Sequence, residues 1–564
     1  MKQTVLLDAG VVTRCRRRVH LEHDPSMRHA PQAPADPAAD QRQADAATHR
    51  QQVSATLAEL FGSDWLTIRA ESDATAADME NATLAAMRAG VRLIGNARLP
   101  IDRAGGRRGR IDVLLRVDGT DGRIGYRPLL IVRHKIVDPG SGARTGTLAE
   151  LTGASRIDSM HKARSQPRDQ LRLAHAVLLL RACGFGPPGR VTGGVIGADA
   201  DLVLWHDLEA PTWPGGRTAL AEYESRFADR LAVATAAATG AQALAQPSRV
   251  LDCRSCPWWP VCGAELNAAR DVSLVLRGDD ANQLRQAGIR TVDQLAALDP
   301  RDPAPAAIVS TPMPDAVALA RAWLADLTMV RRVEDVPVPR GDVELDVDME
   351  SFGDSGAYLW GSLLSGVDIG LERRYRAFAT WRPVPTTDEA RSFAHFWEML
   401  REVRARARRQ GLVFRAYCYN ELAENRWLLA SADRFAGLPG VPSRAEVQEF
   451  IDSDEWVDLF RVVSRNFLCA RGKGLKVLAP IAGFSWRDPH ASGENSMRWY
   501  RDAVGMDGDE PKLDQRRRLL AYNEDDVQAT RALREWMSSA AKIEVPYLGD
   551  LLNGAASAAP HPCG

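Results

Sequence analysis

Long apolar runs are missing from this 564-residue chain. No stretch approaches the roughly 18 uncharged apolar residues that a membrane-spanning helix needs. The first residues reach Asp8 after only a few apolar positions, so the N-terminus lacks the apolar segment of a signal peptide. We therefore expect a cytoplasmic protein with no membrane partner.

Cysteine and lysine are also scarce. Eight cysteines are too few for a disulfide framework in a chain of this length. In a reducing compartment, any thiols that cluster indicate metal ligation before disulfides. Only seven of the 72 basic residues are lysine, which we interpret as codon bias. The net charge of −1 gives no support for a nucleic-acid partner, so that case must come from local patches.

The length and the order of strand-like and helical patterns predict several α/β domains. Residues 1–268 form the first: they carry strand-like runs at 91–94, 111–117 and 129–132 and helices at 168–182 and 219–245. Residues 269–335 hold two short helices around Gly288–Ile289, typical of a helix-hairpin-helix DNA contact or of a plain helical linker. Residues 336–548 form a second α/β domain, with strands in VELDVDMES, YLWGSLLSG and LVFRAYCYN, and 549–564 are a flexible tail.

The densest chemical signal is a cysteine cluster. Cys253, Cys256 and Cys262 stand in the segment LDCRSCPWWPVC, and Cys15 is the candidate fourth ligand more than two hundred residues earlier. Three thiolates this close can hold zinc or an iron–sulfur cluster, and the spacing leaves both open. Four unrelated buried thiols are the alternative interpretation.

A lone N-terminal cysteine followed by C-x2-C-P-x4-C resembles the iron–sulfur subgroup of RecB-type nucleases. The whole chain is similar to the bacterial RecB-like nuclease family that carries a C-terminal ribonuclease H-like exonuclease domain of the YprB type. The resemblance implies a restriction-endonuclease-like PD-(D/E)XK fold for the first domain and a role in DNA repair. It also implies a [4Fe–4S] cluster on Cys15, Cys253, Cys256 and Cys262.

The RecB-type pattern can be followed residue by residue in the first domain. Its acid, lysine, histidine and glutamine match Asp112, Lys135, His49 and Gln170. Arg133 stands where a carboxylate belongs, and a guanidinium cannot ligate a cation. The tyrosine expected four residues after Gln170 is Ala174. We expect lost or impaired catalysis here, unless another acid such as Asp138 substitutes.

The second domain carries three acidic elements. Asp348 and Glu350 are two residues apart on an expected strand, so both carboxylates point to one face. Glu424 follows Asn420 by four residues near an expected helix start. Tyr522 and Asp526 lie four apart on one face of a helix expected at 516–537. Such carboxylates can bridge two cations.

These elements resemble the DEDD exonucleases of the ribonuclease H-like superfamily, in their tyrosine-bearing form. The resemblance implies that Asp348, Glu350, Glu424 and Asp526 hold two Mg²⁺ or Mn²⁺ ions and that Tyr522 orients the attacking water. Glu424 stands where aspartate is usual, so Glu421 competes for its role, and Asp525 competes less strongly with Asp526. Asp458 is expected to be structural and Lys476 to contact phosphate. Solvated surface acids are the alternative for the whole set.

Basic clusters add weak support for nucleic acid. Arginines flank Cys15, precede Asp112, fill REVRARARRQ and stand at Arg516, Arg517 and Arg518. Solvated faces on an arginine-rich chain explain each equally well. The function that we predict is metal-dependent exonuclease activity of the C-terminal domain on DNA, or less readily on RNA, with an unidentified repair or helicase partner. A non-catalytic nucleic-acid-binding scaffold with degenerate sites is the alternative.

Overall fold

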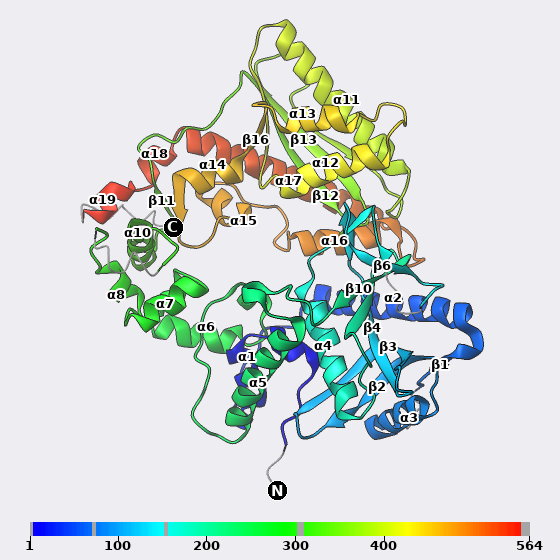
Figure 1. The fold of residues 1–564 in the computed structure, drawn as a ribbon. Coiled ribbons are helices and arrows are strands. Elements are labelled where there is room, and N and C mark those ends of the chain that lie inside the picture. The colour runs from blue at the N-terminus through cyan, green and yellow to red at the C-terminus, as the bar shows by residue number, and fades with distance from the viewer. Residues whose placement is uncertain (1–3, 70–74, 152–155, 302–308, 554–564) are drawn as a thin grey trace. The chain divides into compact units, whose positions relative to one another are not determined.

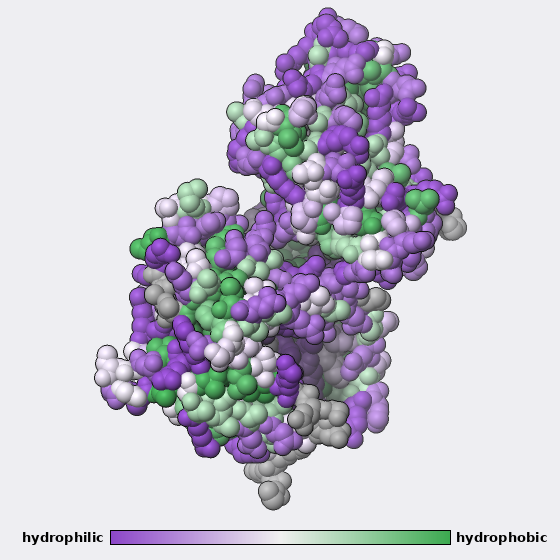
Figure 2. Space-filling model, turned by 90° about the vertical axis from the view of Figure 1, so that its right-hand side faces the viewer, coloured by the Kyte–Doolittle hydropathy of each residue, from purple (hydrophilic) through white to green (hydrophobic). Residues whose placement is uncertain are grey.

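The computed structural model describes residues 4–69, 75–151, 156–301 and 309–553 (Figure 1). The chain divides into two units, residues 1–265 and 266–564. Each unit combines helices with a mixed sheet, which confirms the mixed α/β class. None of the described helices has the length and apolar character needed to cross a membrane. On the face drawn in Figure 2, hydrophilic residues predominate and apolar residues lie in patches between them.

The first unit is built on an eight-stranded sheet in the order β1-β2-β3-β4-β9-β10-β6-β7. Its strands are β1 Trp65–Thr67, β2 Leu93–Asp102, β3 Arg107–Asp118, β4 Ile124–Ile131, β6 Arg144–Thr147, β7 Arg156–Ile157, β9 Thr192–Ile196 and β10 Leu202–Asp207, and β5 Val137–Pro139 pairs separately with β8 His161–Ala163. The helices are α1 Arg16–His23, α2 Pro37–Phe61, α3 Ala76–Arg88, α4 Pro167–Ala182, α5 Ala219–Ala238 and α6 Trp259–Ala268, the last of which runs across the boundary between the units.

Apolar side chains cover both faces of this sheet. Val53 and Leu57 of α2 pack with Leu115 and Trp205 on one face, and α3, α4 and α5 supply the core of the other. The helix predicted over 219–245 is shorter than expected and ends at Ala238. The cause is Gly240, which takes a φ of 66° that a helix cannot continue through.

The second unit contains a five-stranded sheet in the order β14-β13-β12-β15-β16. Its strands are β12 Val343–Ser351, β13 Ala357–Gly366, β14 Tyr375–Ala379, β15 Phe414–Cys418 and β16 Trp456–Asp458, and β11 Met329–Arg331 pairs separately with β17 Phe467–Cys469. The helices are α7 Asp279–Gln286, α8 Val292–Ala296, α10 Met313–Leu324, α11 Asp388–Arg409, α12 Leu422–Arg434, α13 Arg444–Ile451, α14 Leu459–Asn466, α15 Leu475–Leu478, α16 Gly493–Val504, α17 Leu513–Ser538, α18 Ala541–Glu544 and α19 Leu548–Leu552.

The central strand β12 has two different faces. Its odd-numbered residues Val343, Leu345 and Val347 pack in an aromatic-rich core with α11, α12 and α13. Its even-numbered residues face α17, the long red helix of Figure 1. The predicted helix at 516–537 is confirmed as part of α17. The alternation of a strand therefore separates an apolar side from a side that carries only acids between residues 344 and 350.

A helical hairpin forms where the sequence predicts it. The helices α7 and α8 flank Gly288, which has a φ of 88°. Thr291 caps α8 through a reciprocal pair of hydrogen bonds with Gln294. Arg285 is paired with Asp271 at 2.5 Å, so part of the positive charge of this hairpin is already neutralised. A role in contacting DNA remains a prediction.

Candidate functional site

Four carboxylates alternate along the α17 side of β12. They belong to Glu344, Asp346, Asp348 and Glu350, and all but the half-buried Asp348 are at most 7% exposed. A row of buried carboxylates is costly unless positive charge compensates it. The two halves of the row obtain that charge in different ways.

The first half is neutralised by the protein. The fully buried guanidinium of Arg534, on α17, donates to Asp346 Oδ2 at 2.7 Å and also contacts Glu344. Arg340 donates from Nε to Glu344 Oε1 at 2.7 Å. This half of the row is thus a closed ion network, in which each acid has a guanidinium partner.

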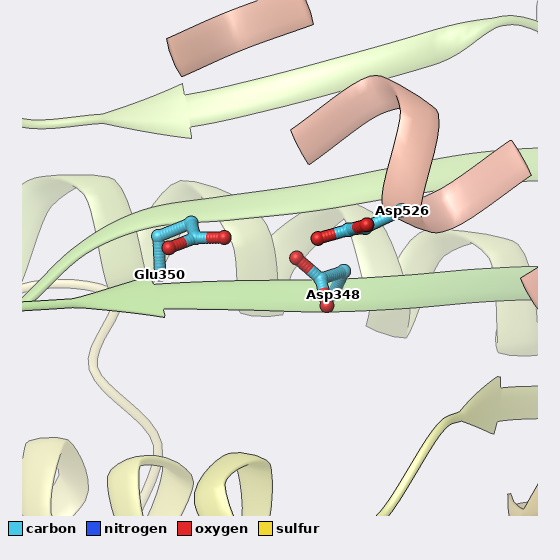
Figure 3. Close-up of side chains that lie close together, drawn as sticks. All are labelled: Asp348, Glu350 and Asp526. Atoms are coloured by element: carbon cyan, nitrogen blue, oxygen red, sulfur yellow. The ribbon is translucent and has the colours of Figure 1, made fainter. Parts of the chain in front are cut away.

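The second half has no such partner. Asp526 extends from α17 toward Asp348, and Figure 3 shows the Asp348 and Glu350 side chains rising from β12 on the same side. Each of these three residues offers a carboxylate oxygen, and the three oxygens lie within 4.8 Å of one another. Within the described ranges, no arginine or lysine forms an ion pair with any of the three. In this half, α17 places the acid Asp526 opposite the strand acids, whereas in the first half it places Arg534 there.

This crowding raises the proton affinity of the carboxyls. Burial, followed by the charge of Asp526, raises the pKa of Glu350 to about 8. Burial and the neighbouring Asp526 and Glu350 raise the pKa of Asp348 well above its ordinary value. Burial is also the main cause of the raised pKa of Asp526. Three crowded acids that repel one another form a site whose repulsion a multivalent cation would relieve.

Glu424 lies near this group but outside the set of three. It stands in the first turn of α12 and is 4% exposed. Burial raises its pKa to about 8, and the charge of Glu350 contributes. Its Oε2 atom is buried without a hydrogen-bond partner in the described structure. Because an orphaned carboxylate oxygen is expensive, this atom fits a role as an additional cation ligand.

The rival acids have other partners. Glu421 is paired with Arg461, and Asp525 accepts hydrogen bonds from the main-chain N and the Nε of Arg487 at 2.9 and 2.7 Å. Asp458 caps α14, where its Oδ1 accepts from Phe460 N at 2.8 Å. These engagements favour Glu424 and Asp526 as the acids available to a cation, because neither forms an ion pair with a described arginine or lysine.

Tyr522 and Lys476 lie beside the acids. The Tyr522 side chain is 5% exposed, and its pKa is raised by burial and by the surrounding carboxylates. The Lys476 ammonium lies 3.5 Å from the Tyr522 hydroxyl and 4.7 Å from the centre of its ring. Trp486 donates from Nε1 to Asp526 Oδ1 at 2.6 Å. The site thus combines a hydroxyl, an ammonium and a group of acids.

Asn523 is a site residue that sequence reasoning missed. It is fully buried, its Nδ2 donates to Asp348 Oδ2 at 2.7 Å, and its Oδ1 accepts from the Tyr375 hydroxyl at 2.7 Å. A Cβ atom at Gly361 would lie 1.7 Å from Asn523 Oδ1, so a glycine is required opposite Asp348 on β13. The sequence signal for Asn523 is its position three residues before Asp526, which places both residues on one face of the same helix.

The arginines at the start of α17 have mixed environments. Arg516 donates to the Ala503 carbonyl at 2.9 Å, Arg517 is exposed, and Arg518 is paired with Asp488 at 2.5 Å. The arginines of α11 that the sequence offered as a basic patch are largely paired: Arg401, Arg404, Arg406 and Arg408 each contact a glutamate. The α11 cluster is therefore a poor phosphate surface.

The predicted acid of the first unit is surrounded by cations. Asp112 accepts from Ile131 N at 2.8 Å, burial raises its pKa, and the guanidinium of Arg50 lies 4.0 Å away. Arg133, which replaces the expected carboxylate, is paired with Asp45 of α2 at 3.1 Å. Positive side chains thus stand where a metal-binding carboxylate is required.

The other residues of that pattern have separate partners. His49 Nε2 is 3.1 Å from the Gly197 carbonyl, and Gln170 Oε1 accepts from Trp213 Nε1 at 2.9 Å. Lys135 is half-buried. In the parts of the chain with described coordinates, no three metal-ligating atoms converge around Asp112.

The four predicted cysteine ligands line one cavity. Cys15, Cys253, Cys256 and Cys262 surround a space of about 370 Å³. Val250 N donates to the Cys253 sulfur at 3.4 Å, and burial raises the pKa of Cys262 to about 12. Among the described residues, no three of these sulfurs lie within 4.8 Å of one another. These thiols come from just before α1, from the 251–255 turn and the residue after it, and from α6, and they line one cavity without converging on a single point.

Comparison with known families identifies part of the second unit. Residues 436–538 match the RNase_H superfamily, a range that includes Lys476, Tyr522, Asn523 and Asp526. The C-terminal part of the chain therefore contains an RNase H-like domain, as predicted. No match was found among curated proteins or among solved structures.

Proposed function

We propose that the second unit is a metal-dependent nuclease, acting as an exonuclease on DNA or RNA. The proposal rests on the second half of the β12 row, where no described arginine or lysine forms an ion pair with the acids. Arg534 neutralises Glu344 and Asp346, whereas Asp348 and Glu350 face a third acid, Asp526. Acids arranged in this way on an RNase H-like domain fit Mg²⁺ or Mn²⁺.

The ligands in this proposal are Asp348, Glu350, Asp526 and Glu424. Bound cations would polarise the phosphodiester and lower the pKa of an attacking water. The orphaned Oε2 of Glu424 supports its inclusion despite the longer side chain. Asn523 would fix Asp348 by holding its Oδ2, leaving Oδ1 for a cation.

Tyr522 and Lys476 have roles that follow from their contacts. The Tyr522 hydroxyl stays protonated at neutral pH because its pKa is raised, so it can donate to or orient a water. The Lys476 ammonium, which lies 4.7 Å from the centre of the Tyr522 ring and 5.6 Å from that of the Trp486 ring, would contact the negatively charged phosphate. Arg516, Arg517 and Arg518 would add weaker contacts along the strand.

In the first unit we propose a RecB-like domain that binds nucleic acid without hydrolysing it. The pairing of Arg133 with Asp45 and the approach of Arg50 to Asp112 support this loss of metal binding. The four cysteines would hold a [4Fe–4S] cluster. The position of all four cysteines in the lining of one cavity supports this assignment.

The experiment is degradation of end-labelled single- and double-stranded DNA and RNA by the full chain with Mn²⁺ or Mg²⁺. Asp348→Ala should lower the rate about a thousandfold, because one lost ligand removes several kcal/mol of transition-state stabilisation. The matched control is Asp509→Ala, which removes an exposed carboxylate and should leave the rate unchanged. Lys135→Ala should also leave it unchanged.

Three results would contradict the proposal. Full activity in Asp348→Ala would show that the second unit is not the catalyst. A large loss of activity in Lys135→Ala would show that the first unit catalyses the cleavage. Inactivity of the wild type on all four substrates would favour the non-catalytic scaffold.

A further inference from the structure

A small cavity in the first unit is built on three neighbouring strands. Its volume is about 90 Å³, and its lining includes Arg127, Thr192 and Asp207. Thr192 of β9 lies directly opposite Asp207 of β10. Arg127 of β4 lies beside Thr192, because Leu129 pairs with Gly194 two positions later on parallel strands. These side chains therefore share one end of one sheet face.

Two further arginines complete a positive lining. Arg144 enters from β6, and Arg190 from the segment before β9. Arg190 is paired with Asp207 at 2.7 Å, whereas Arg144 forms no ion pair with any described residue. Three guanidinium groups and one carboxylate therefore line the cavity. His206, which also lines the cavity, adds no charge to it, because burial lowers its pKa and keeps it neutral at pH 7.

Two lining groups would gain from an anion. Burial lowers the pKa of Arg127, because it disfavours the charged guanidinium. The Thr192 hydroxyl is buried and has no hydrogen-bond partner within the described structure. An oxyanion would stabilise the first and could accept a hydrogen bond from the second.

We propose that this cavity is a binding site for one phosphate group. Its volume accommodates a few water molecules and hence one tetrahedral oxyanion, but no nucleoside. Forked guanidinium donors match the oxygens of a phosphate. The group could belong to free phosphate or to a nucleic-acid strand. The site lies in the unit that lacks the Asp348 acids, so it does not depend on the proposed nuclease activity.

The test is calorimetric titration of the full chain with inorganic phosphate, without divalent cations. The wild type should bind one phosphate. Arg144→Gln should weaken binding about tenfold or more, because a charge-assisted hydrogen bond is lost. The matched control is Arg123→Gln, which removes an arginine with 78% of its side chain exposed, outside the cavity, and should bind like the wild type.

Thr192→Val supplies a second measurement that folding defects cannot imitate. It removes an unpartnered hydroxyl at constant volume, so the melting temperature without phosphate should be unchanged or higher. Its phosphate affinity should nevertheless fall. Equal affinities of Arg144→Gln, Thr192→Val and the wild type would overturn the proposal, as would the absence of any saturable phosphate binding.

Competition experiments distinguish the sources of the phosphate. An oligonucleotide with a terminal phosphate that displaces inorganic phosphate better than its unphosphorylated form would assign the site to strand ends. Equal displacement by both forms would assign it to the backbone. Displacement by neither would assign it to free phosphate. Each of these results supports the site, provided that Arg144→Gln weakens the same binding.

Discussion

At the scale of single residues, the acids around Asp348 compete for protons as well as for cations. Glu350 and Glu424 have pKa values raised to about 8, so both are largely protonated at pH 6 without metal. A cation requires the ionised forms and must displace these protons. Metal affinity is therefore linked to pH through groups that the sequence identified, but whose burial it did not indicate.

The first prediction concerns this linkage. The Mn²⁺ concentration for half-maximal activity should fall as the pH rises from about 6 to about 8, because fewer protons must leave. A second readout is stability without metal. The folded state keeps protons on Glu350 between its ordinary pKa of 4.5 and about 8, so the melting temperature should fall as pH rises through that window. Mn²⁺ at pH 8 should restore it.

The control for this prediction is Asp348→Asn, which removes one of the repelling charges. Its melting temperature without metal should depend less on pH than that of the wild type. A wild-type melting temperature that rises between pH 5 and 8 would show that the acids are not held in the protonated state.

Asn523 is expected to position Asp348 rather than to touch substrate. Asn523→Asp keeps the size of the side chain but replaces the donor to Asp348 with a fourth repelling carboxylate. The acidic limb of the pH–rate profile should move to higher pH, and the rate at pH 7 should fall about tenfold. The matched control is Gln528→Glu, which adds the same charge about 140° around the same helix. Equal pH profiles for both variants would reduce Asn523 to a packing role.

At the scale of elements, β12 and α17 form one charged interface with two ends. Asn523, Asp526 and Arg534 lie on one stripe of α17, spaced by turns of the helix. Arg534 meets the acids of the early part of β12, and Asp526 meets those of the late part. The same pairing of strand and helix therefore makes a closed ion network at one end and a cation site at the other.

Arg534 should be essential to this pairing. Arg534→Met would leave Glu344 and Asp346 buried beside each other and should destabilise the second unit by about 3–5 kcal/mol. The matched control, Arg531→Met, removes a half-exposed arginine of the same helix that pairs with Glu535 and with no other described acid, and should cost less than about 1 kcal/mol. Urea unfolding of the full chain measures both. Equal costs would mean that Arg534 does not compensate the buried acids.

The alternating pattern of β12 and the turn spacing of α17 were visible in the sequence, which is why Asp348, Glu350 and Asp526 could be proposed together. Arg534 and Asn523 were not found, because their roles arise only when α17 docks on β12. The strand β14 was missed as well, since its YRAFA segment lies at a sheet edge and gives little hydrophobic contrast. The helix that the sequence predicts is longer than the observed α5, because alanine-rich sequence continues past Gly240.

At the scale of the whole molecule, the two proposed metal centres lie in different units. The cysteine cavity belongs to residues 1–265, and the acids belong to residues 266–564. Cys15 lies immediately before α1, whereas Cys262 lies in α6, so a cluster would join the two ends of the first unit. Closing a loop of that length adds stability that grows only slowly with its size.

The last prediction separates the two centres by their chemistry. Anaerobically purified wild type should be brown and contain about four iron atoms per chain. Cys256→Ser should lose the iron and lower the melting temperature of the first unit, yet keep Mn²⁺-dependent cleavage, because the Asp348 acids are untouched. Asp526→Asn should do the reverse and keep the iron while losing cleavage. The matched control is Cys418→Ser, a buried cysteine outside the cavity, which should retain both. Colourless protein with stoichiometric zinc would contradict the iron–sulfur assignment, and loss of cleavage together with iron would show that the second unit depends on the first.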